Sequence, residues 1–376
     1  MNRPDRGLAP RLWRGFRHDY LLHVLLVACV ALTLARPGAV ATFPALVDWP
    51  TIAALSGLLV LTKGVEVSGF FHRLGFHLIT LEHTERQLAF FLAASAALLS
   101  ALLTNDIALF IVVPLTLSLH GMASLPITRL VVFEALAVNA GSALTPVGNP
   151  QNLFLWQRSG MTFHAFVVEM LPLTAILLAV LAAMTAIAFP GRRVDATEDA
   201  EVPALDRRLL VTSVALYPLF IVAADLRHAG AGLAVVLGVF FVVRRSVLRR
   251  VDWALIAAFV LMFVDVRLVA QHDLVREAVA RAGLAEPRHL YLAGVALSQI
   301  MSNVPTAILL AEHSDDARLI AYAVDVGGFG LALGSLANLI ALRMLRKPGA
   351  WVVFHGYSLP YLLVAGALVY VWLFWR

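Results

Sequence analysis

The chain has 376 residues, of which 60% are hydrophobic and only 14% are charged. A soluble domain usually carries about 25% charged residues, so this composition excludes a large soluble domain and indicates a membrane protein. The single cysteine, Cys29, excludes an internal disulfide, a redox pair of cysteines and a multi-cysteine zinc site. The net charge of +5 does not indicate nucleic acid as a partner, because the basic residues lie in short loops between apolar segments.

The N-terminal region contains a basic segment, 1–19, followed by an apolar segment, 20–36. Ala39-Val40-Ala41 has the small residues of a signal-peptide cleavage site. Many more apolar segments follow, however, so we interpret 20–36 as a first transmembrane helix.

The apolar segments predict an all-α polytopic membrane protein. A bilayer core of about 30 Å needs about 20 apolar residues per helix, and about nine full spans meet this need. These spans are predicted at 20–36, 51–66, 127–158, 164–190, 209–225, 231–243, 252–270, 317–342 and 351–375.

Two further apolar segments, 88–119 and 288–311, are each interrupted by a polar tripeptide. The arms of the first, 88–103 and 107–119, are about 24 and 20 Å long as helices, which is shorter than the bilayer core. We therefore expect two re-entrant hairpins that enter and leave on one side.

Loop charge predicts the orientation of the chain. With a cytoplasmic N-terminus and hairpins that do not cross, 19 of the 29 Lys and Arg residues lie in cytoplasmic segments. This excess agrees with the positive-inside rule. The sequence therefore predicts a multi-pass protein of the inner, cytoplasmic membrane, with its C-terminus outside.

The chain contains an internal repeat. Thr104-Asn105-Asp106 matches Ser302-Asn303-Val304, and the run 138–153 aligns without a gap on 324–339. We predict a first repeat at 1–190, a linker loop and connecting span at 191–230, and a second repeat at 231–376. The odd number of crossings between them predicts that the second repeat is inverted. The first hairpin then opens to the cytoplasm and the second to the outside.

The two broken spans, 127–158 and 317–342, place polar residues and glycines at membrane depth in matching positions of the repeats. Irregular backbone is tolerated there only where it is buried in protein or lines a cavity. Such paired discontinuous helices are typical of a transporter binding site. Their N-termini favour an anion, while free carbonyls and Asn, Ser and Thr oxygens suit a small cation such as Na⁺.

The predicted substrate-binding residues come from both hairpin tips and both breaks. They are Thr104, Asn105, Asp106, Thr145, Pro146, Asn149, Asn152, Ser302, Asn303, Pro305, Thr306 and Asn338. Capping of the helix at 107–119 is the alternative role for Asn105 and Asp106, and Pro305 also suits the first turn of a helix.

The predicted Na⁺ ligands overlap with this set. They are Asn105, Asp106, Gly141, Gly148, Ser302, Asn303, Asp325, Gly327 and Gly334. Close helix packing is the alternative explanation for the glycines.

Charged residues inside membrane spans are candidates for function. Asp325 aligns with Asn139 and is a candidate proton or cation site, and Glu134 is a second candidate for proton transfer. Asp265 and Arg267 are close enough in sequence that we expect a local ion pair.

These residues resemble those of the ion transporter superfamily, which includes citrate transporters, divalent-anion/sodium symporters, arsenite efflux permeases and one class of sodium/proton antiporters. The resemblance covers essentially the whole chain. It is most specific at 103–106, 145–153 and 302–305. It implies a domain of hairpins and broken helices that moves against a scaffold in an elevator-like cycle, often in a dimer.

The hairpin tips can be compared with those of one branch of that superfamily. In the divalent-anion symporters, a Ser/Thr-Asn-Thr triplet at each tip binds sodium and substrate carboxylate together. Thr104-Asn105 and Ser302-Asn303 match two of the three positions, whereas Asp106 and Val304 depart from the third. The first tip is thus more similar to the citrate, arsenite and antiporter branches.

The sequence therefore predicts a secondary active transporter of a small anion, either a di- or tricarboxylate or an inorganic oxyanion, coupled to Na⁺ or H⁺. A Na⁺/H⁺ antiporter and an arsenite-type efflux permease are the alternatives. An intramembrane hydrolase with Asp265 and Asp325 as a dyad lacks the accompanying motifs, so we expect no enzyme. Besides the coupling ion we expect no cofactor. The expected partners are the anion, the lipid bilayer and, as an open possibility, a second copy of the chain.

Overall fold

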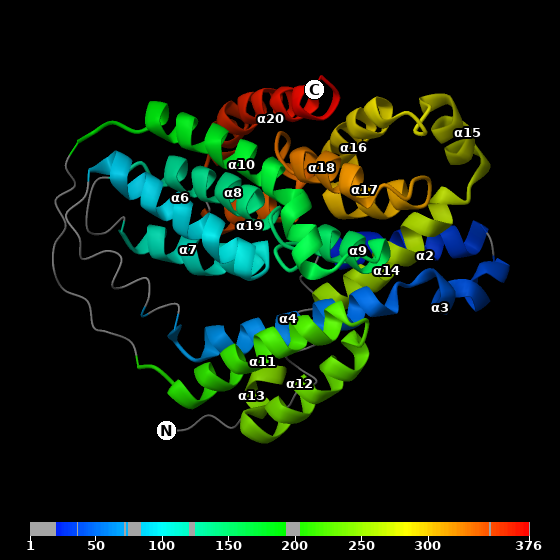
Figure 1. Cartoon of the computed structure of the whole chain (residues 1–376), viewed down its shortest axis with the longest axis horizontal. Coiled ribbons are helices and arrows are strands. Elements are labelled where there is room, and N and C mark those ends of the chain that lie inside the picture. The colour runs from blue at the N-terminus through cyan, green and yellow to red at the C-terminus, as the bar shows by residue number, and fades with distance from the viewer. Residues whose placement is uncertain are drawn as a thin grey trace. The chain divides into compact units, whose positions relative to one another are not determined.

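The structure is a computed structural model that describes residues 20–35, 37–70, 73, 84–119, 125–192, 204–345 and 347–375. The regular elements of these residues are helices (Figure 1), which confirms the prediction of an all-α protein. The basic segment 1–19 and most of the polar loop predicted between the repeats, 193–203, lie outside the described residues.

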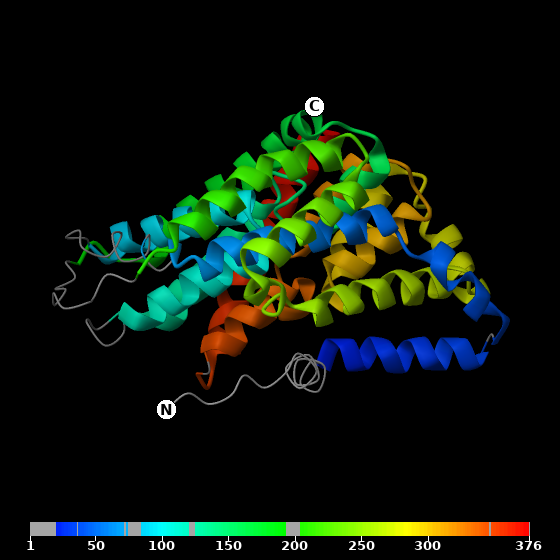
Figure 2. The same ribbon diagram turned by 90° about the horizontal axis from the view of Figure 1, so that it is seen from below.

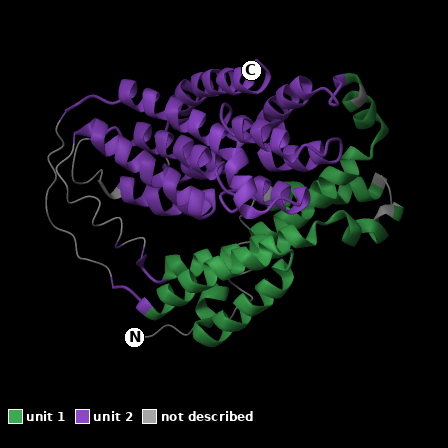
Figure 3. Cartoon of the chain, in the orientation of Figure 1, with its two compact units in different colours: residues 1–67, 208–281 green, residues 68–207, 282–376 purple. Residues whose placement is uncertain are grey.

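The chain divides into two compact units, shown in Figure 3. Unit 1 comprises residues 1–67 and 208–281. Its helices are α2 (Tyr20–Ala35), η1 (Pro37–Thr42), α3 (Phe43–Leu46), α4 (Trp49–Val67), α11 (Arg207–Asp225), α12 (Ala229–Val243), α13 (Arg245–Leu248), α14 (Trp253–Ala270) and α15 (Asp273–Ala282).

Glycines allow close packing inside unit 1. A Cβ atom on Gly57 would lie 2.1 Å from the ring of Phe220, and one on Gly64 would lie 2.7 Å from the ring of Phe240. Both rings therefore occupy the space that the side chain of any residue other than glycine would need at these two positions of α4.

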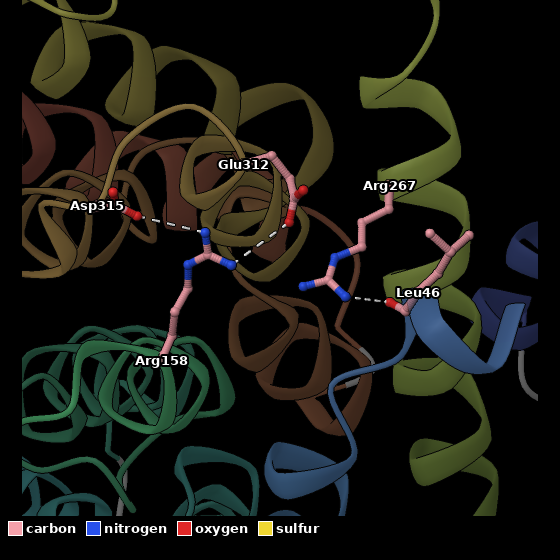
Figure 4. Close-up of polar contacts among 5 residues, drawn as sticks. All are labelled: Leu46, Arg158, Arg267, Glu312 and Asp315. Carbon is pink, nitrogen blue, oxygen red and sulfur yellow. Dashed lines mark hydrogen bonds and ion pairs between the residues drawn. The ribbon is translucent and has the colours of Figure 1, made fainter. Parts of the chain in front are cut away.

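The prediction of an ion pair between Asp265 and Arg267 is wrong. Arg267 Nη1 donates to the carbonyl oxygen of Leu46 at 2.6 Å, as Figure 4 shows. Both carboxylate oxygens of the buried Asp265 lack a hydrogen-bond partner among the described residues. Residues two apart on a helix do not face each other, which explains why α14 keeps the two groups separate.

Unit 2 comprises residues 68–207 and 282–376. Its helices are α6 (Glu85–Leu102), α7 (Asn105–Leu119), α8 (Ile127–Ser142), α9 (Pro150–Ser159), α10 (Phe163–Ala188), α16 (Pro287–Met301), α17 (Asn303–Ala311), α18 (Ala317–Gly327), η2 (Ala332–Gly334), α19 (Leu336–Leu345) and α20 (Ala350–Phe374). Each predicted repeat is thus divided between the two units, with its hairpin and broken helix in unit 2.

Equivalent helices of the two repeats pack in the same way inside unit 2. α6 and α7 lie side by side and both pack on α8, and α16 and α17 pack in the same manner on α18 (Figures 1 and 2). The half-helices after the breaks cross over, because α9 contacts α17 and α18 while α19 contacts α7 and α8. The polar breaks of the two repeats are therefore brought into one core.

Six described helices, α4, α6, α10, α11, α14 and α20, are long and apolar enough to cross a membrane. Together with the shorter apolar helices they make the chain a polytopic membrane protein. The 18 residues of α6 extend about 27 Å, so this helix is nearer to a full span than the arm predicted for the first hairpin. The re-entrant path of both hairpins stays a prediction.

Candidate functional site

The first tip, Thr104-Asn105-Asp106, joins α6 to α7 and is tied to the first break, residues 143–149. The backbone N–H of Asn105 donates to the carbonyl oxygen of Gly148 at 2.8 Å. Thr104 and Asn105 are buried, and Thr104 Oγ1 has no hydrogen-bond partner among the described residues. The tip therefore faces the protein interior, and the Thr104 hydroxyl is a buried polar group there.

The first break is held on both sides by its own side chains. Thr145 Oγ1 donates to the carbonyl oxygen of Ala101 on α6 at 2.6 Å. Asn149 Oδ1 accepts from the backbone N–H of Asn152 at 2.8 Å and so caps α9, with Pro150 at the first helical position. Asn149 is thus the N-cap of α9, and its amide nitrogen is left for other contacts.

The predicted glycine ligands have a clear packing role. A Cβ atom on Gly141 would lie 2.1 Å from the carbonyl oxygen of Ala97, and one on Gly148 would lie 2.3 Å from that of Ser142. In the second repeat a Cβ on Gly327 would meet Ser298, and one on Gly334 would meet the carbonyl oxygen of Gly327. Cation binding by these glycine carbonyls stays a prediction.

The second tip, Ser302-Asn303-Val304, joins α16 to α17 through a strained residue. Ser302 has φ 71° and ψ 158°, a backbone region that is used almost only by glycine. Its carbonyl oxygen accepts from Thr306 Oγ1 at 2.8 Å, which secures the first turn of α17 around Pro305. Asn303 is buried, and its Nδ2 lies 3.2 Å from where a Cβ on Gly328 would stand.

The second break, residues 328–335, is held by Gln299, which the sequence reasoning missed. Gln299 Nε2 donates to the carbonyl oxygen of Gly327 at 2.7 Å, and its Oε1 accepts from the N–H of Leu331 at 2.8 Å. Gln299 aligns with Ala101 and Leu331 aligns with Thr145. In the first repeat the polar side chain that joins break and hairpin, Thr145, lies in the break. In the second repeat the corresponding side chain, Gln299, lies on the hairpin helix α16.

The first set of contacts between the repeats surrounds Asn139 on α8. Asn139 Nδ2 donates to Asn338 Oδ1 at 2.8 Å, and Asn139 Oδ1 accepts from Ser335 Oγ at 3.0 Å. Asn338 Nδ2 in turn donates to the carbonyl oxygen of Gly328 at 2.9 Å. A residue of the first repeat is thereby bonded to the start of α19 in the second.

The second set surrounds Asp325 on α18, at the position equivalent to Asn139. Asp325 Oδ1 accepts from Asn149 Nδ2 at 3.2 Å and from Gln151 Nε2 at 3.0 Å. Asp325 Oδ2 accepts from Asn152 Nδ2 at 2.9 Å. We call the two sets the crossed contacts, because each repeat sends one side chain to the half-helix that follows the other repeat's break.

The crossed contacts join equivalent positions, since Asn149 aligns with Ser335 and Asn152 aligns with Asn338. The two sets differ in charge, however. Asp325 is 2% exposed and makes no ion pair with a described residue, so only neutral amide donors stabilise its carboxylate. Such a group attracts a cation or a proton more strongly than the neutral amide of Asn139 does.

An ion-pair cluster lies at the far end of α9. Arg158 Nη1 lies 3.9 Å from Glu312 Oε1, and Arg158 Nη2 lies 3.8 Å from Asp315 Oδ1. Figure 4 shows the guanidinium group between the two carboxylates, which follow α17. Arg158 and Glu312 are partly exposed and Asp315 is fully exposed, so solvent screens both pairs and they contribute little to stability.

The structure gathers most of the predicted site residues into the core of unit 2, and it adds three that were not among them. The additions are Asn139, Gln151 and Gln299. The signal that could have identified them is a polar side chain within an apolar helix. Asp106 lies at the start of α7 and its N–H bonds to Asn105 Oδ1 at 2.9 Å.

The residues that could hold a cation here are oxygen donors. Across the described ranges, no group of three or more His, Cys, Asp or Glu side chains comes together. Thr104 Oγ1, Gln151 Oε1 and Asn152 Oδ1 are buried oxygens without a hydrogen-bond partner among the described residues. Hydroxyl, amide and carboxylate oxygens of this kind suit a hard cation better than a transition metal.

The chain is similar to known membrane transport proteins. It matches the family model described as "Citrate transporter" over residues 12–315. It is 44% identical over 359 residues to "Inner membrane protein YbiR" of Escherichia coli (strain K12), covering 95% of this chain and 96% of that protein. A shorter match, 32% identical over 126 residues, is to "Silicon efflux transporter LSI3" of Oryza sativa subsp. japonica, covering 34% of this chain and 26% of that one.

Among solved structures, the fold is similar to that of the YdaH transporter of Alcanivorax borkumensis. The TM-score is 0.55 and the sequence identity 16%, over 94% of this chain and 98% of that one. At this identity the likeness shows a shared fold alone. The family match and the relative of nearly equal length nevertheless agree that the chain belongs to the citrate transporter family, whose members are transporters and not enzymes.

Proposed function

We propose that the chain is a secondary active transporter of a small anion, either a di- or tricarboxylate or an inorganic oxyanion. Transport is driven by a Na⁺ or H⁺ gradient. It acts in the inner membrane, with its N-terminus in the cytoplasm and its C-terminus outside. Binding takes place in the core of unit 2, at the two tips and the two breaks.

The crossed contacts are the observation that supports this proposal most directly. They tie the start of α9 to α18 and the start of α19 to α8. The hydrogen bond from Asn105 to Gly148 and the proximity of Asn303 to Gly328 place the starts of α7 and α17 beside the two breaks. Helix N-termini present free N–H groups and partial positive charge, which favour an anion. No simple structural need would retain four such starts in the interior of a membrane protein.

The division into two units supports an elevator-like cycle. Unit 2 contains both tips, both breaks and the crossed contacts, whereas unit 1 contains none of them. A binding core that is one compact body can move as a whole while the contacts around the site are kept. We propose that unit 2 is the moving part.

Asp325 favours a second candidate, a Na⁺/H⁺ antiporter or an arsenite-type efflux permease. An uncompensated buried carboxylate repels an anion, so it must first be neutralised by a cation or a proton. In the symporter this neutralisation couples the ion to anion binding. In the antiporter the alternating binding of Na⁺ and H⁺ by this carboxylate is itself the transport reaction. The relative named for silicon efflux is consistent with an efflux function.

Ligand-dependent thermal unfolding tests the proposal first. Purified protein is heated with citrate, succinate, sulfate or arsenite, each with and without Na⁺. A ligand present at about 100 times its Kd stabilises the protein by about 2.7 kcal/mol. Stabilisation by one anion, strengthened by Na⁺ or by low pH, is the expected result.

Transport in proteoliposomes then separates the candidates. Anion uptake driven by an imposed Na⁺ or pH gradient supports the symporter, and Na⁺-driven proton movement without any anion supports the antiporter. Asn105→Ala and Asn303→Ala should abolish either activity. Thr212→Ala is the matched control, since that exposed hydroxyl bonds only to the carbonyl of Arg208 in its own helix. Full activity in both Asn variants would contradict the site.

A further inference from the structure

A second buried carboxyl lies in unit 2, away from the crossed contacts. Glu134 on α8 is 1% exposed, and its Oε1 accepts a hydrogen bond from the buried Thr116 Oγ1 on α7. Glu134 Oε2 is also buried and has no hydrogen-bond partner among the described residues. Thr116 is the one described group that bonds to this carboxyl.

The surroundings of Glu134 supply no compensating charge. The helices packed against α8 are α6, α7, α10, α19 and α20. Their charged or titratable residues are Glu85, Arg86, Asp106, His164, Glu169, Arg343, His355, Tyr357, Tyr361 and Tyr370. None of these forms an ion pair or a hydrogen bond with Glu134. On α8 itself, Arg129 points elsewhere, since it donates to the carbonyl oxygen of Ala188 and lies over the ring of Phe189.

The carboxyl is not needed for the packing of the repeat. When the alignment of 138–153 on 324–339 is extended by four residues, Glu134 matches Ile320. Ile320 is fully buried on α18, so an apolar side chain fills the equivalent place. An ionisable group at such a position is costly and calls for a functional reason.

The protonation state follows from the environment. A carboxylate without a cation and with a single hydroxyl donor loses far more solvation than one hydrogen bond restores. A neutral carboxylic acid at the same place leaves at most one polar atom unsatisfied, which costs much less. Glu134 is therefore the neutral acid while its surroundings exclude water.

We infer that Glu134 and Thr116 form a proton-binding site between the first hairpin and the first broken helix, which makes the proton a coupling ion. The inference rests on the proposed function. When unit 2 moves so that water from one side of the membrane reaches the carboxyl, the O–H bond breaks and the proton passes to that water. When unit 2 moves so that water from the other side reaches the carboxylate, the carboxylate takes up a proton from that solution.

The first test reads the proton itself and needs no substrate. Infrared difference spectra of the protein in lipid vesicles are recorded between high and low pH, in the carbonyl-stretch region of protonated carboxylic acids. Wild type should show a band that is absent in Glu134→Gln and present in Glu169→Gln, an exposed carboxylate on α10. Thr116→Val should shift that band rather than remove it, because it removes only the hydrogen bond.

The second test measures coupling with radiolabelled citrate, or with whichever anion of the panel stabilises the wild type. With the membrane potential clamped, a gradient of one pH unit coupled to one proton supports about tenfold accumulation. Glu134→Gln should reduce this to about onefold. Exchange of labelled for unlabelled anion at equal pH should continue, because it needs no net proton movement.

The outcomes separate this inference from the proposed function. Loss of the band and of pH-driven accumulation in Glu134→Gln, with exchange retained, supports the proton site. A band that persists in Glu134→Gln, or pH-driven accumulation that persists there, overturns it. If wild type transports no anion, the proposed function fails, and the infrared result alone still decides whether Glu134 carries the proton.

Discussion

Two equivalent positions in unit 2, Asn139 on α8 and Asp325 on α18, make the same kind of contact with different charge. Each bonds across to the half-helix after the other repeat's break. The neutral amide of Asn139 is sufficient to join the repeats on its side. The carboxylate of Asp325 adds a negative charge that joining the repeats does not require, which is consistent with the ion coupling proposed above.

The two tips differ in a similar way. At the first tip the equivalent residue, Thr104, is not among the described non-glycine residues with a positive φ angle. At the second, Ser302 is held at φ 71°. A non-glycine residue in this region costs about 1–3 kcal/mol and persists only where its surroundings enforce it. The comparison indicates that strain is concentrated at one of the two tips.

The largest effect is expected from removing the Asp325 carboxylate. Asp325→Ala leaves three buried amide groups without their acceptor, so the free energy of unfolding should fall by about 1–3 kcal/mol for each of them. Asn139→Ala breaks neutral bonds only and should cost about 1–3 kcal/mol. Chemical unfolding in detergent measures both. Equal losses for the two variants would show that the charge has no special role in the contact.

Asp325→Asn sharpens the same comparison. It makes the second repeat resemble the first while keeping a hydrogen-bonding side chain of equal size. We expect stability closer to wild type than that of Asp325→Ala, together with loss of coupled transport. Coupled transport at the wild-type rate would remove Asp325 from the mechanism.

A smaller effect is expected at the two glycines where each broken helix meets its hairpin. Gly141→Ala pushes a methyl group into the backbone of Ala97, whereas Gly327→Ala pushes one into the side chain of Ser298. Overpacking of this kind costs about 1–3 kcal/mol, and more where backbone must move. Thermal unfolding should therefore show the larger loss for Gly141→Ala.

The obstacle at Gly327 can be removed, which gives a control. In the double variant Ser298→Gly with Gly327→Ala, the side chain that blocks the methyl group is absent. The stability lost in the single variant should largely return. If the double variant is as unstable as the sum of the singles, the close approach of α16 to α18 is not the cause.

The smallest effect is expected at Ser302. Ser302→Gly keeps the backbone conformation but removes its steric cost, so the free energy of unfolding should rise by about 1 kcal/mol. Thr104→Gly, at the equivalent position of the unstrained first tip, should instead lower it by about 0.5–1 kcal/mol. Thermal unfolding of the two variants side by side tests this, and a loss of stability in both would contradict the strain at Ser302.

Much of the helical order could be predicted from hydropathy. The spans expected at 164–190 and 351–375 are α10, Phe163–Ala188, and α20, Ala350–Phe374. The breaks after Ser142 and Gly327 follow from glycine and proline clusters, which cannot continue a helix. These features depend on residues close together in the chain, so their physical cause is visible in the sequence.

The contacts within the site could be predicted only in part. The repeat alignment placed Asn139 opposite Asp325, but it could not show that each bonds to the other repeat. Gln299 was missed because its counterpart in the first repeat is the apolar Ala101. The polar side chain that holds the break lies in the break itself in the first repeat and on the hairpin helix in the second. The division into two units was also hidden, since each repeat contributes to both and tertiary packing decides the boundary.

The central claim, that the two breaks form one site, can be tested by crosslinking. In a background of Cys29→Ser, the pair Asn139→Cys and Ser335→Cys replaces two side chains whose polar atoms lie 3.0 Å apart. Treatment of membranes with a permeant oxidant, followed by mass spectrometry, measures the disulfide. We predict rapid and nearly complete formation in the double variant, with none in either single variant. Two thiols that stay reduced in a folded protein would contradict the account.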